Sequence, residues 1–331
     1  MVRFLRRLKW LLKWGWKTRS WFWTKAFLQY HVPPIYPVFT NKKKELLISN
    51  TNFILPPKEG IRHLIEAFDD LSTFALSGAR FIVHAPWDQI ELAGLRFNIY
   101  SPQSIRILSE VFLQGIYEVS LPARPVVIDI GMNVGISSIS LAGTLGCPVY
   151  GYEPFKDTFR KATENININP DFSDRIHAFQ YAVGGTNRKE EFEFCPDSPG
   201  DCGIVPIPEI YRRGRRSYKE TVEVISAADV VDFVSREEPD RCVVLKLDCE
   251  GMEYEIFDCL CKTGAISKVG VIMAEWHRRG DFGSPSALRD TLRKCGFVTF
   301  GNPHRASEVG MLYAVNDNMK CSEKHFEKTS A

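Results

Sequence analysis

Two stretches of the sequence place residues that could do chemistry directly after predicted strands. In the first, VVIDIGMNVGISS, Asp129 ends an apolar run and is followed by Gly131 and Gly135. Glycine lets the backbone turn tightly and approach a ligand, and the free amides of a following helix attract an anion. Asn133 stands between the two glycines, and asparagine tolerates the same left-handed geometry. This pattern predicts a turn that holds a small ligand.

The second predicted strand ends in VYGYEP, which places Glu153 and Pro154 about 20 residues after the turn, where a carboxylate can accept hydrogen bonds from ribose hydroxyls. Nicotinamide dinucleotides are disfavoured, because their fingerprint needs glycine where Asn133 and Ile136 stand. S-adenosylmethionine fits instead, since its carboxylate can meet the amides from Gly131 to Ser137 and its ribose can meet Glu153. A strand-to-helix turn without a ligand is the alternative.

Ionisable side chains gather after two later predicted strands. LKLDCEGMEYEI reaches its strand end near Asp248 and Glu250, and VIMAEWH delivers Glu275 and His277 to the same edge of the sheet. Methyl transfer from a sulfonium to an alcohol requires alignment of the acceptor and removal of its proton. Asp248 and His277 are the bases that we expect. Three carboxylates are expected to orient them or the acceptor: Glu250, Glu253 and Glu275.

Lys246 lies within the same strand as Asp248 and is counted with this catalytic group. A lysine in a central strand is costly unless it is paired, so we expect a carboxylate to neutralise it: Asp248, Asp129 or Glu275. A divalent ion held by Asp248, Glu250 and Glu275 is an alternative role for the acids. Clustering of carboxylates in sequence does not establish coordination, and the nine cysteines lack zinc-type spacing. We therefore predict no metal site.

Hydrophobic periodicity predicts the elements that position these residues. Short branched apolar runs, typical of buried strands, stand at residues 126–130, 149–152, 178–183, 243–248 and 269–275. Helical patterns lie near residues 134–145, 155–168, 226–235, 252–261 and 285–295. This alternation predicts an open, mostly parallel α/β sheet with helices on both faces. Residues 297–300 and 311–315 are expected to close it as an antiparallel hairpin edge.

The chain carries a series of motifs in a characteristic order: VVIDIGMNVGISSISLA, YGYEP, the stretch 165–169, YAVGG, VVLKLDCEGMEYEIFDCL and IMAEWH. Over roughly residues 100–315 it resembles the FkbM-type S-adenosylmethionine-dependent methyltransferases. The resemblance implies a class I methyltransferase (Rossmann-like) fold and methyl transfer, usually to a hydroxyl oxygen of a sugar, polyketide or related small molecule. Met132 departs from the family's DIGAN-x-G pattern at one position.

The amino-terminal segment has a different composition. Residues 1–44 contain 11 basic side chains and no carboxylate, which leaves 31 basic against 40 acidic residues in the rest. Five of the seven tryptophans lie between Trp10 and Trp23, and helical spacing sorts apolar residues and cations onto opposite sides. Lysines interrupt the apolar run before the roughly 20 residues that a spanning helix needs. The pattern favours a helix that lies on an anionic membrane surface; a helix packed on the protein itself and an organelle-targeting segment are the alternatives.

We therefore divide the chain into five parts. They are a basic, Trp-rich leader helix at 1–30, a Pro/Lys-rich linker at 31–60, an extension of helix and short strands at 61–125, the methyltransferase domain at 126–316 and a polar tail at 317–331. The loop YRRGRRSYK, residues 211–219, follows the third predicted strand. It is interpreted as a substrate-side lid that suits a phosphate-bearing acceptor, or as an ordinary surface loop.

The expected function is O-methylation of a hydroxyl on a glycan, a lipid-linked or another small-molecule acceptor. We expect it to take place in the cytoplasm, with peripheral association at a membrane. One alternative is a catalytically inactive, membrane-associated adaptor with the same fold. Another is RNA methylation, but the acidic body lacks the continuous cationic track expected of a nucleic-acid-binding protein, so nucleic acid is not an expected partner.

Deletion of residues 1–30 should release the protein from anionic vesicles, because it removes both the apolar side and the cations of the predicted helix. Co-sedimentation of the full-length and shortened chains measures this. Equal co-sedimentation of the two would contradict a membrane role for the leader.

Overall fold

The computed structural model describes residues 38–40, 42–43, 45–48, 51, 54–55, 62–82, 87–196, 202, 216–278, 284–301 and 308–319. The predicted leader at 1–30 and most of the predicted lid at 211–219 therefore lie outside the described residues. The chain divides into two units between Gly115 and Ile116. We expected the second domain to begin at residue 126. Residues 116–125 also belong to the second unit. Within it, the Tyr313 hydroxyl donates to the carbonyl oxygen of Ile116 at 2.8 Å.

The first unit is built from short elements. Two antiparallel three-stranded sheets contain β1 (Val38–Thr40), β2 (Leu46–Ile48) and β3 (Ile54–Leu55), and β4 (Arg80–Ile82), β5 (Asp88–Leu92) and β6 (Leu95–Ile99). Its helices are α3 (Arg62–Glu66), α4 (Phe68–Leu76), α5 (Pro102–Leu108) and the π-helical turn η1 (Ser109–Leu113). The segment predicted as a linker thus contains paired strands, which are too short for an alternation pattern to reveal.

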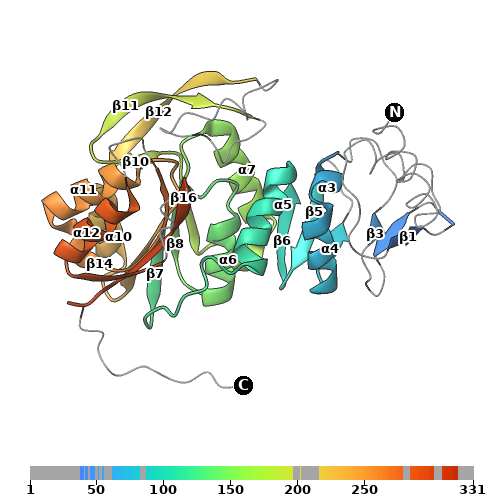
Figure 1. The fold of residues 1–331 in the computed structure, drawn as a ribbon, viewed down its shortest axis with the longest axis horizontal. Helices are drawn as coiled ribbons and strands as arrows, with labels where there is room; N and C mark the ends of the chain where they lie inside the picture. The colour runs from blue at the N-terminus through green and yellow to red at the C-terminus, as the bar shows by residue number, and fades with distance from the viewer. Residues whose placement is uncertain are drawn as a thin grey trace, which may run out of the picture. The chain divides into compact units, whose positions relative to one another are not determined.

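The second unit centres on a seven-stranded sheet with the order β15-β16-β14-β13-β7-β8-β9 (Figure 1). Its strands are β7 (Pro125–Ile130), β8 (Val149–Tyr152), β9 (Ile176–Phe179), β13 (Cys242–Leu247), β14 (Val269–His277), β15 (Phe297–Phe300) and β16 (Val309–Asn316). The strands from β14 to β9 pair in parallel, whereas β16 runs antiparallel to both of its neighbours. The predicted fold class is confirmed, including the hairpin edge: this is the class I methyltransferase arrangement.

Helices cover both faces of this sheet, as predicted. They are α6 (Ile136–Leu145), α7 (Lys156–Asn167), α8 (Pro170–Ser173), α10 (Ala227–Glu237), α11 (Glu253–Thr263), the short 3-10 helix η3 (Ala265–Lys268) and α12 (Pro285–Lys294). In Figure 1, α10, α11 and α12 pack side by side on one face, with α6 and α7 on the other. The central strands β7, β8 and β13 are consequently buried along almost their whole length.

The third predicted strand, residues 178–183, is wrong as a single element. Its first part belongs to β9 of the main sheet, and its last part forms β10 (Ala182–Gly184) of a separate sheet. That sheet has the order β10-β12-β11, with β11 (Arg188–Phe194) and β12 (Tyr218–Ser226) antiparallel. One apolar run can contribute strands to two sheets, because β9 and β10 differ only in their pairing partners, β8 and β12.

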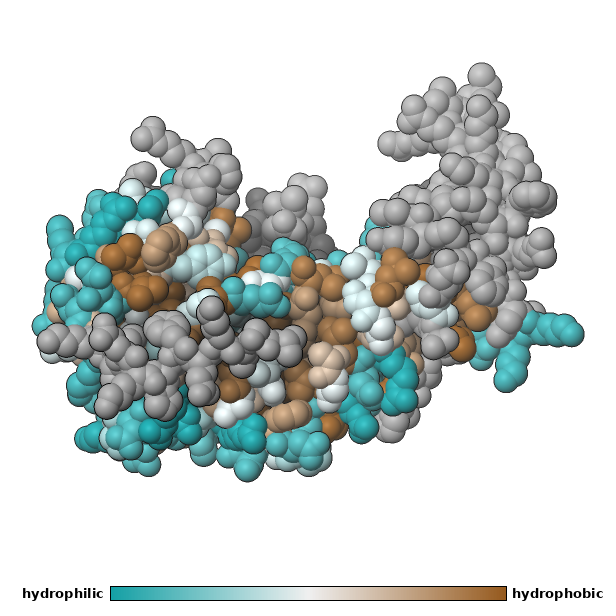
Figure 2. Space-filling model, turned by 90° about the horizontal axis from the view of Figure 1, so that it is seen from below, coloured by the Kyte–Doolittle hydropathy of each residue, from teal (hydrophilic) through white to brown (hydrophobic). Residues whose placement is uncertain are grey.

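On the face that Figure 2 draws, the described surface shows both hydrophilic and apolar side chains, with hydrophilic ones gathered toward the lower edge. Large exposed apolar side chains include Val298, Phe300 and Val315 of the hairpin edge. Within the described ranges, no helix combines the length and hydropathy needed to cross a membrane.

Gly131 and Gly264 form a matched pair that tests the turn after β7. Both have left-handed backbones, with φ of +78° and +79°, but a Cβ at Gly131 would overlap the carbonyl oxygen of Asp248, whereas one at Gly264 would meet nothing within 4 Å. Gly264→Ala should lower the free energy of unfolding by about 1–2 kcal/mol. Gly131→Ala should lower the free energy of unfolding by about 1–3 kcal/mol more than Gly264→Ala does. Urea unfolding measures both values, and equal values would contradict the close approach of Gly131 to the Asp248 carbonyl oxygen.

Candidate active site

A buried ion pair joins the two central strands beneath the site. Register places Lys246 of β13 beside Asp129 of β7, and the Lys246 Nζ lies 2.8 Å from the Asp129 Oδ1. Nζ also donates to the carbonyl oxygen of Gly131 at 2.9 Å. The hydroxyls of Ser137 and Ser138 donate to Asp129 Oδ2, each at 2.7 Å. The expectation that a carboxylate neutralises Lys246 is confirmed, and its partner is Asp129.

Electrostatics keep Lys246 charged in this position. Burial by itself would lower its pKa, but the charges of Asp129 and Asp248 raise it above the usual range. The ammonium also lies over the ring of Tyr117, 5.4 Å from its centroid, an arrangement that favours a cation. Lys246 therefore serves as a fixed cation under the turn.

The turn after β7 has the backbone geometry that its sequence predicts. Gly131, Asn133 and Gly135 all have positive φ, and that of Asn133 is 52°. The amide of Gly131 donates to the carbonyl oxygen of Tyr152 at the end of β8. On the other side, the amide of Asp248 donates to the carbonyl oxygen of Ile130 at 3.0 Å. The turn is thus wedged between the carboxyl ends of the two strands that flank β7.

A pocket opens above this turn. Six predicted site residues line it: Gly131, Asn133, Glu153, Pro154, Asp248 and Glu250. Its apolar wall includes Phe155, Tyr181, Val183, Phe192 and Met252. The predicted residues Asp129, Gly135, Ser137, Lys246, Glu275 and His277 are not part of this lining. Met132, the departure from the family pattern, is buried at 1% exposure and does not line the pocket either.

Glu153 is the most buried acid in the pocket wall. Its Oε1 accepts a hydrogen bond from the amide of Phe155 at 3.0 Å, and the residue is 5% exposed. Burial raises the pKa of this carboxyl to about 8, against the backbone hydrogen bonds of Phe155 and Asn133, which lower it. With a pKa of about 8, this carboxyl is largely protonated at neutral pH. Hydroxyl donors from a ligand would favour its ionised form.

His277 lies at the end of β14 between two carboxylates. Its Nδ1 is 2.9 Å from Glu253 Oε1, and its Nε2 is 3.3 Å from Glu250 Oε2. Burial would lower the pKa of the imidazole, but the hydrogen bond to Glu253 and the charges of Glu250, Glu253 and Asp248 raise it to about 10. Without another ligand, the ring therefore carries a proton on both nitrogens near neutral pH.

Asp248, Glu250 and His277 come together at this point. One ligand-type atom from each lies within 4.8 Å of the others. Our alternative for a divalent ion combined the two acids with Glu275, but among the described residues it is His277 that completes this group. Glu275 instead acts electrostatically on Lys246 and Tyr313.

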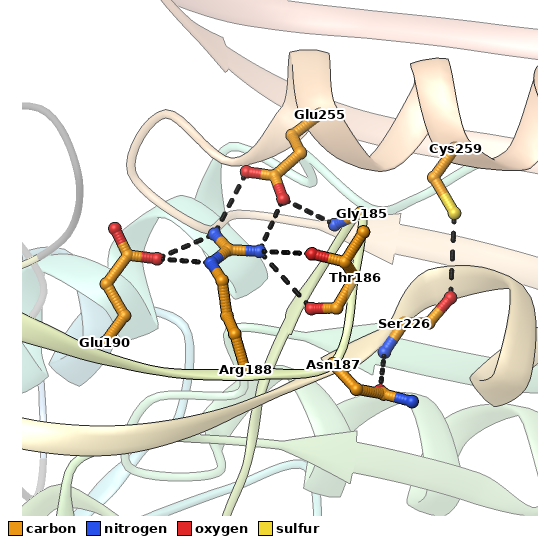
Figure 3. Close-up of polar contacts among 8 residues, drawn as sticks. All are labelled: Gly185, Thr186, Asn187, Arg188, Glu190, Ser226, Glu255 and Cys259. Atoms are coloured by element: carbon orange, nitrogen blue, oxygen red, sulfur yellow. Dashed lines mark hydrogen bonds and ion pairs between the residues drawn. The ribbon is translucent and has the colours of Figure 1, made fainter.

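The helix that carries Glu253, α11, is tied by its first turn to the second sheet (Figure 3). Arg188 of β11 donates to Glu255 through both terminal nitrogens, at 2.6 and 3.1 Å. Glu255 also accepts from the amide of Gly185 at 2.7 Å, and Arg188 pairs with Glu190 as well. This junction fixes the start of α11 relative to the sheet that supplies Val183 and Phe192 to the pocket.

Sequence reasoning missed this second-sheet wall and the Arg188–Glu255 contact. The two residues are 67 positions apart. Glu255 lies within the motif LKLDCEGMEYEI, but Arg188 belongs to no motif that would identify it as the partner. It did include Glu253 among the orienting acids, and the structure shows that side chain fully buried rather than solvated.

The methyltransferase FkbM domain family matches residues 129–299, just over half of the chain. Among curated proteins, the chain is 24% identical over 251 residues to the AMB antimetabolite synthetase AmbE of Pseudomonas aeruginosa. That match covers 64% of this chain and only 11% of the length of the relative.

Two solved methyltransferases are among the similar structures. A methyltransferase FkbM from Methylobacillus flagellatus has 14% identity and a TM-score of 0.37, over 76% of this chain and 59% of that one. The magnesium protoporphyrin IX methyltransferase ChlM from Synechocystis PCC 6803, solved with bound S-adenosylmethionine, has 15% identity and a TM-score of 0.35. The match covers 78% of that chain and 64% of this chain.

Lys246→Met should lower the free energy of unfolding by about 3–5 kcal/mol, because it leaves the buried Asp129 carboxylate without its cation. The double variant Lys246→Met/Asp129→Asn should recover part of the loss. Lys262→Met is the matched control, since it removes an exposed pair with Asp258 and should cost less than about 1 kcal/mol. Urea unfolding gives the three values. If Lys246→Met and Lys262→Met lowered the free energy of unfolding by similar small amounts, the stabilising role of the Lys246–Asp129 pair would be contradicted.

Proposed function

The chain belongs to the FkbM methyltransferase family, and we propose that it is an S-adenosylmethionine-dependent O-methyltransferase. The acceptor is a hydroxyl group on a glycan, a lipid-linked or another small molecule. One observation carries the proposal: the glycine turn, the buried Glu153 and the carboxylate of Asp248 line a single pocket at the carboxyl ends of β7, β8 and β13. This is the edge at which open α/β sheets bind ligands.

The residues present fit the methyl donor. Gly131 lines the pocket, and the absence of a side chain lets a ligand approach its main chain. Glu153 is a buried acceptor suited to ribose hydroxyls. The first-turn amides of α6 suit a carboxylate. The Ser137 hydroxyl is held by Asp129, so Ser137 would contribute its backbone amide.

The donor supplies an electrophilic methyl group on a sulfonium. The protein must therefore align the acceptor oxygen and take up its proton. Asp248 is the base that the geometry favours, because the residue lines the pocket and its carboxylate lies close to Glu250 and His277. His277 already holds a proton on each nitrogen where its pKa is about 10, so in that state it orients Glu250 and accepts no proton. Glu253 in turn orients His277.

Peripheral association with an anionic membrane through residues 1–30 is part of the proposal and would suit a lipid-linked acceptor. It is supported by the composition of the leader alone. The inactive-adaptor alternative is disfavoured, because an adaptor has no need of a buried acid and a pocket-lining carboxylate around the same glycine turn.

Incubation of the protein with methyl-labelled S-adenosylmethionine and a small-molecule and lipid extract should give a labelled product whose methyl group is ether-linked. Asp248→Asn should lower its rate of formation at least about 100-fold, since it removes the proton acceptor. Mass spectrometry identifies the product, and calorimetry should show that the variant still binds S-adenosylmethionine.

Asp258→Asn is the control, because it removes an exposed carboxylate of α11 that pairs with Lys262. It should leave the rate unchanged. Full activity of Asp248→Asn would refute the assigned base. Absence of S-adenosylmethionine binding by the wild-type protein would refute the proposed function itself.

A further inference from the structure

We propose that Asp248, Glu250 and His277 form a binding site for one divalent metal ion of the first transition row. Each residue offers a ligand atom, and these atoms lie within 4.8 Å of one another. Asp248 and Glu250 also line the pocket. An ion held by the three would therefore lie at the pocket wall and would share Asp248 with the proposed methyl transfer.

The chemical types of the three ligand atoms favour one class of metal ion. Two carboxylates alone would suit magnesium or calcium, whereas an imidazole adds affinity for manganese, iron or zinc. Three protein ligands leave coordination positions open for water or for an oxygen of the acceptor. The set thus resembles a catalytic site more than a closed structural one.

A second observation, outside these three residues, points to a ligand on His277. Metal-binding histidines donate their other ring nitrogen to a carboxylate that orients the ring. Glu253 provides this contact at Nδ1, at 2.9 Å, and is itself 0% exposed. The amide of Gly251 donates to the same oxygen of Glu253 at 3.2 Å. The other oxygen, Oε2, is buried without a hydrogen-bond partner in the part of the chain that the structure describes.

Glu253 therefore holds the ring so that Nε2 turns toward Glu250. The contact between Nε2 and Glu250 Oε2 is 3.3 Å. Nε2 is thereby placed to bind an ion that the carboxylates of Asp248 and Glu250 also reach.

The catalytic role of this ion rests on the proposed function, although its binding does not. An acceptor hydroxyl bound to the ion becomes more acidic. Its O–H bond breaks, and the proton passes to the oxygen of Asp248 that does not bind the ion and then to water. The new O–CH3 bond forms as the S–CH3 bond breaks, and the electron pair of that bond stays on the sulfur. The ion keeps its oxidation state, so no further reactant is needed.

The test uses the full-length protein after treatment with EDTA. Titration with Mn²⁺, followed by electron paramagnetic resonance, should show one bound ion per chain. Glu250→Gln and His277→Ala should each weaken this binding at least about tenfold. Glu253→Gln keeps all three ligands and should weaken it by about 10–100-fold. Asp258→Asn, which removes an exposed acid of the same helix, should bind Mn²⁺ as the wild type does.

S-adenosylmethionine affinity, measured by calorimetry on each variant, reports whether the pocket is intact. If His277→Ala does not fold, Glu250→Gln carries the test alone. Wild-type protein that binds S-adenosylmethionine but no stoichiometric Mn²⁺ overturns the metal site and leaves the proposed function standing. So does Mn²⁺ binding that is equal in wild type and Glu250→Gln. Stoichiometric Mn²⁺ binding that depends on Glu250, without S-adenosylmethionine binding, supports the metal site and overturns the proposed function.

Discussion

A charge pair with almost no exposure to water, Lys246 with Asp129, is the constraint on which the pocket depends. Burying either group alone would cost several kcal/mol, so each must keep its partners. Lys246 has Asp129, the carbonyl oxygen of Gly131 and the face of Tyr117. The pair therefore fixes the register between β7 and β13 and clamps the first residue of the glycine turn. A different strand pairing would leave two charges in the core.

The glycine turn after β7 connects this ion pair to the proposed base. Gly131 packs against the backbone of Asp248 so closely that no side chain fits between them. The peptide that shapes the turn thereby positions the residue that we assign as the base. Carboxylates then concentrate on the other side of Asp248, where Glu250 and the fully buried Glu253 face His277. That excess of negative charge is costly in a buried site, and it is balanced by a proton or, in our inference, by a metal ion.

The second sheet completes the site from a distant part of the chain. It supplies apolar side chains to the pocket, and Arg188 ties it to the first turn of α11. Because Glu253 begins that helix, the wall of the pocket and the partner of His277 are held by one junction. A substitution of Arg188 would thus alter both the shape and the electrostatics of the site, although Arg188 does not line the pocket.

The fold class follows from the sequence, because parallel strands buried on both faces leave continuous apolar runs such as residues 126–130 and 243–247. The glycine turn and the strand-end acids of the pocket also follow from it, because both are local properties, and Asn133 takes the predicted left-handed conformation. The apolar wall of the pocket, the acid that neutralises Lys246, the division of residues 178–183 between two sheets and the meeting of His277 with Asp248 and Glu250 follow only from the three-dimensional structure. These outcomes depend on which strands lie side by side and on how deeply each charge is buried. Neither property is encoded in the spacing of residues along the chain.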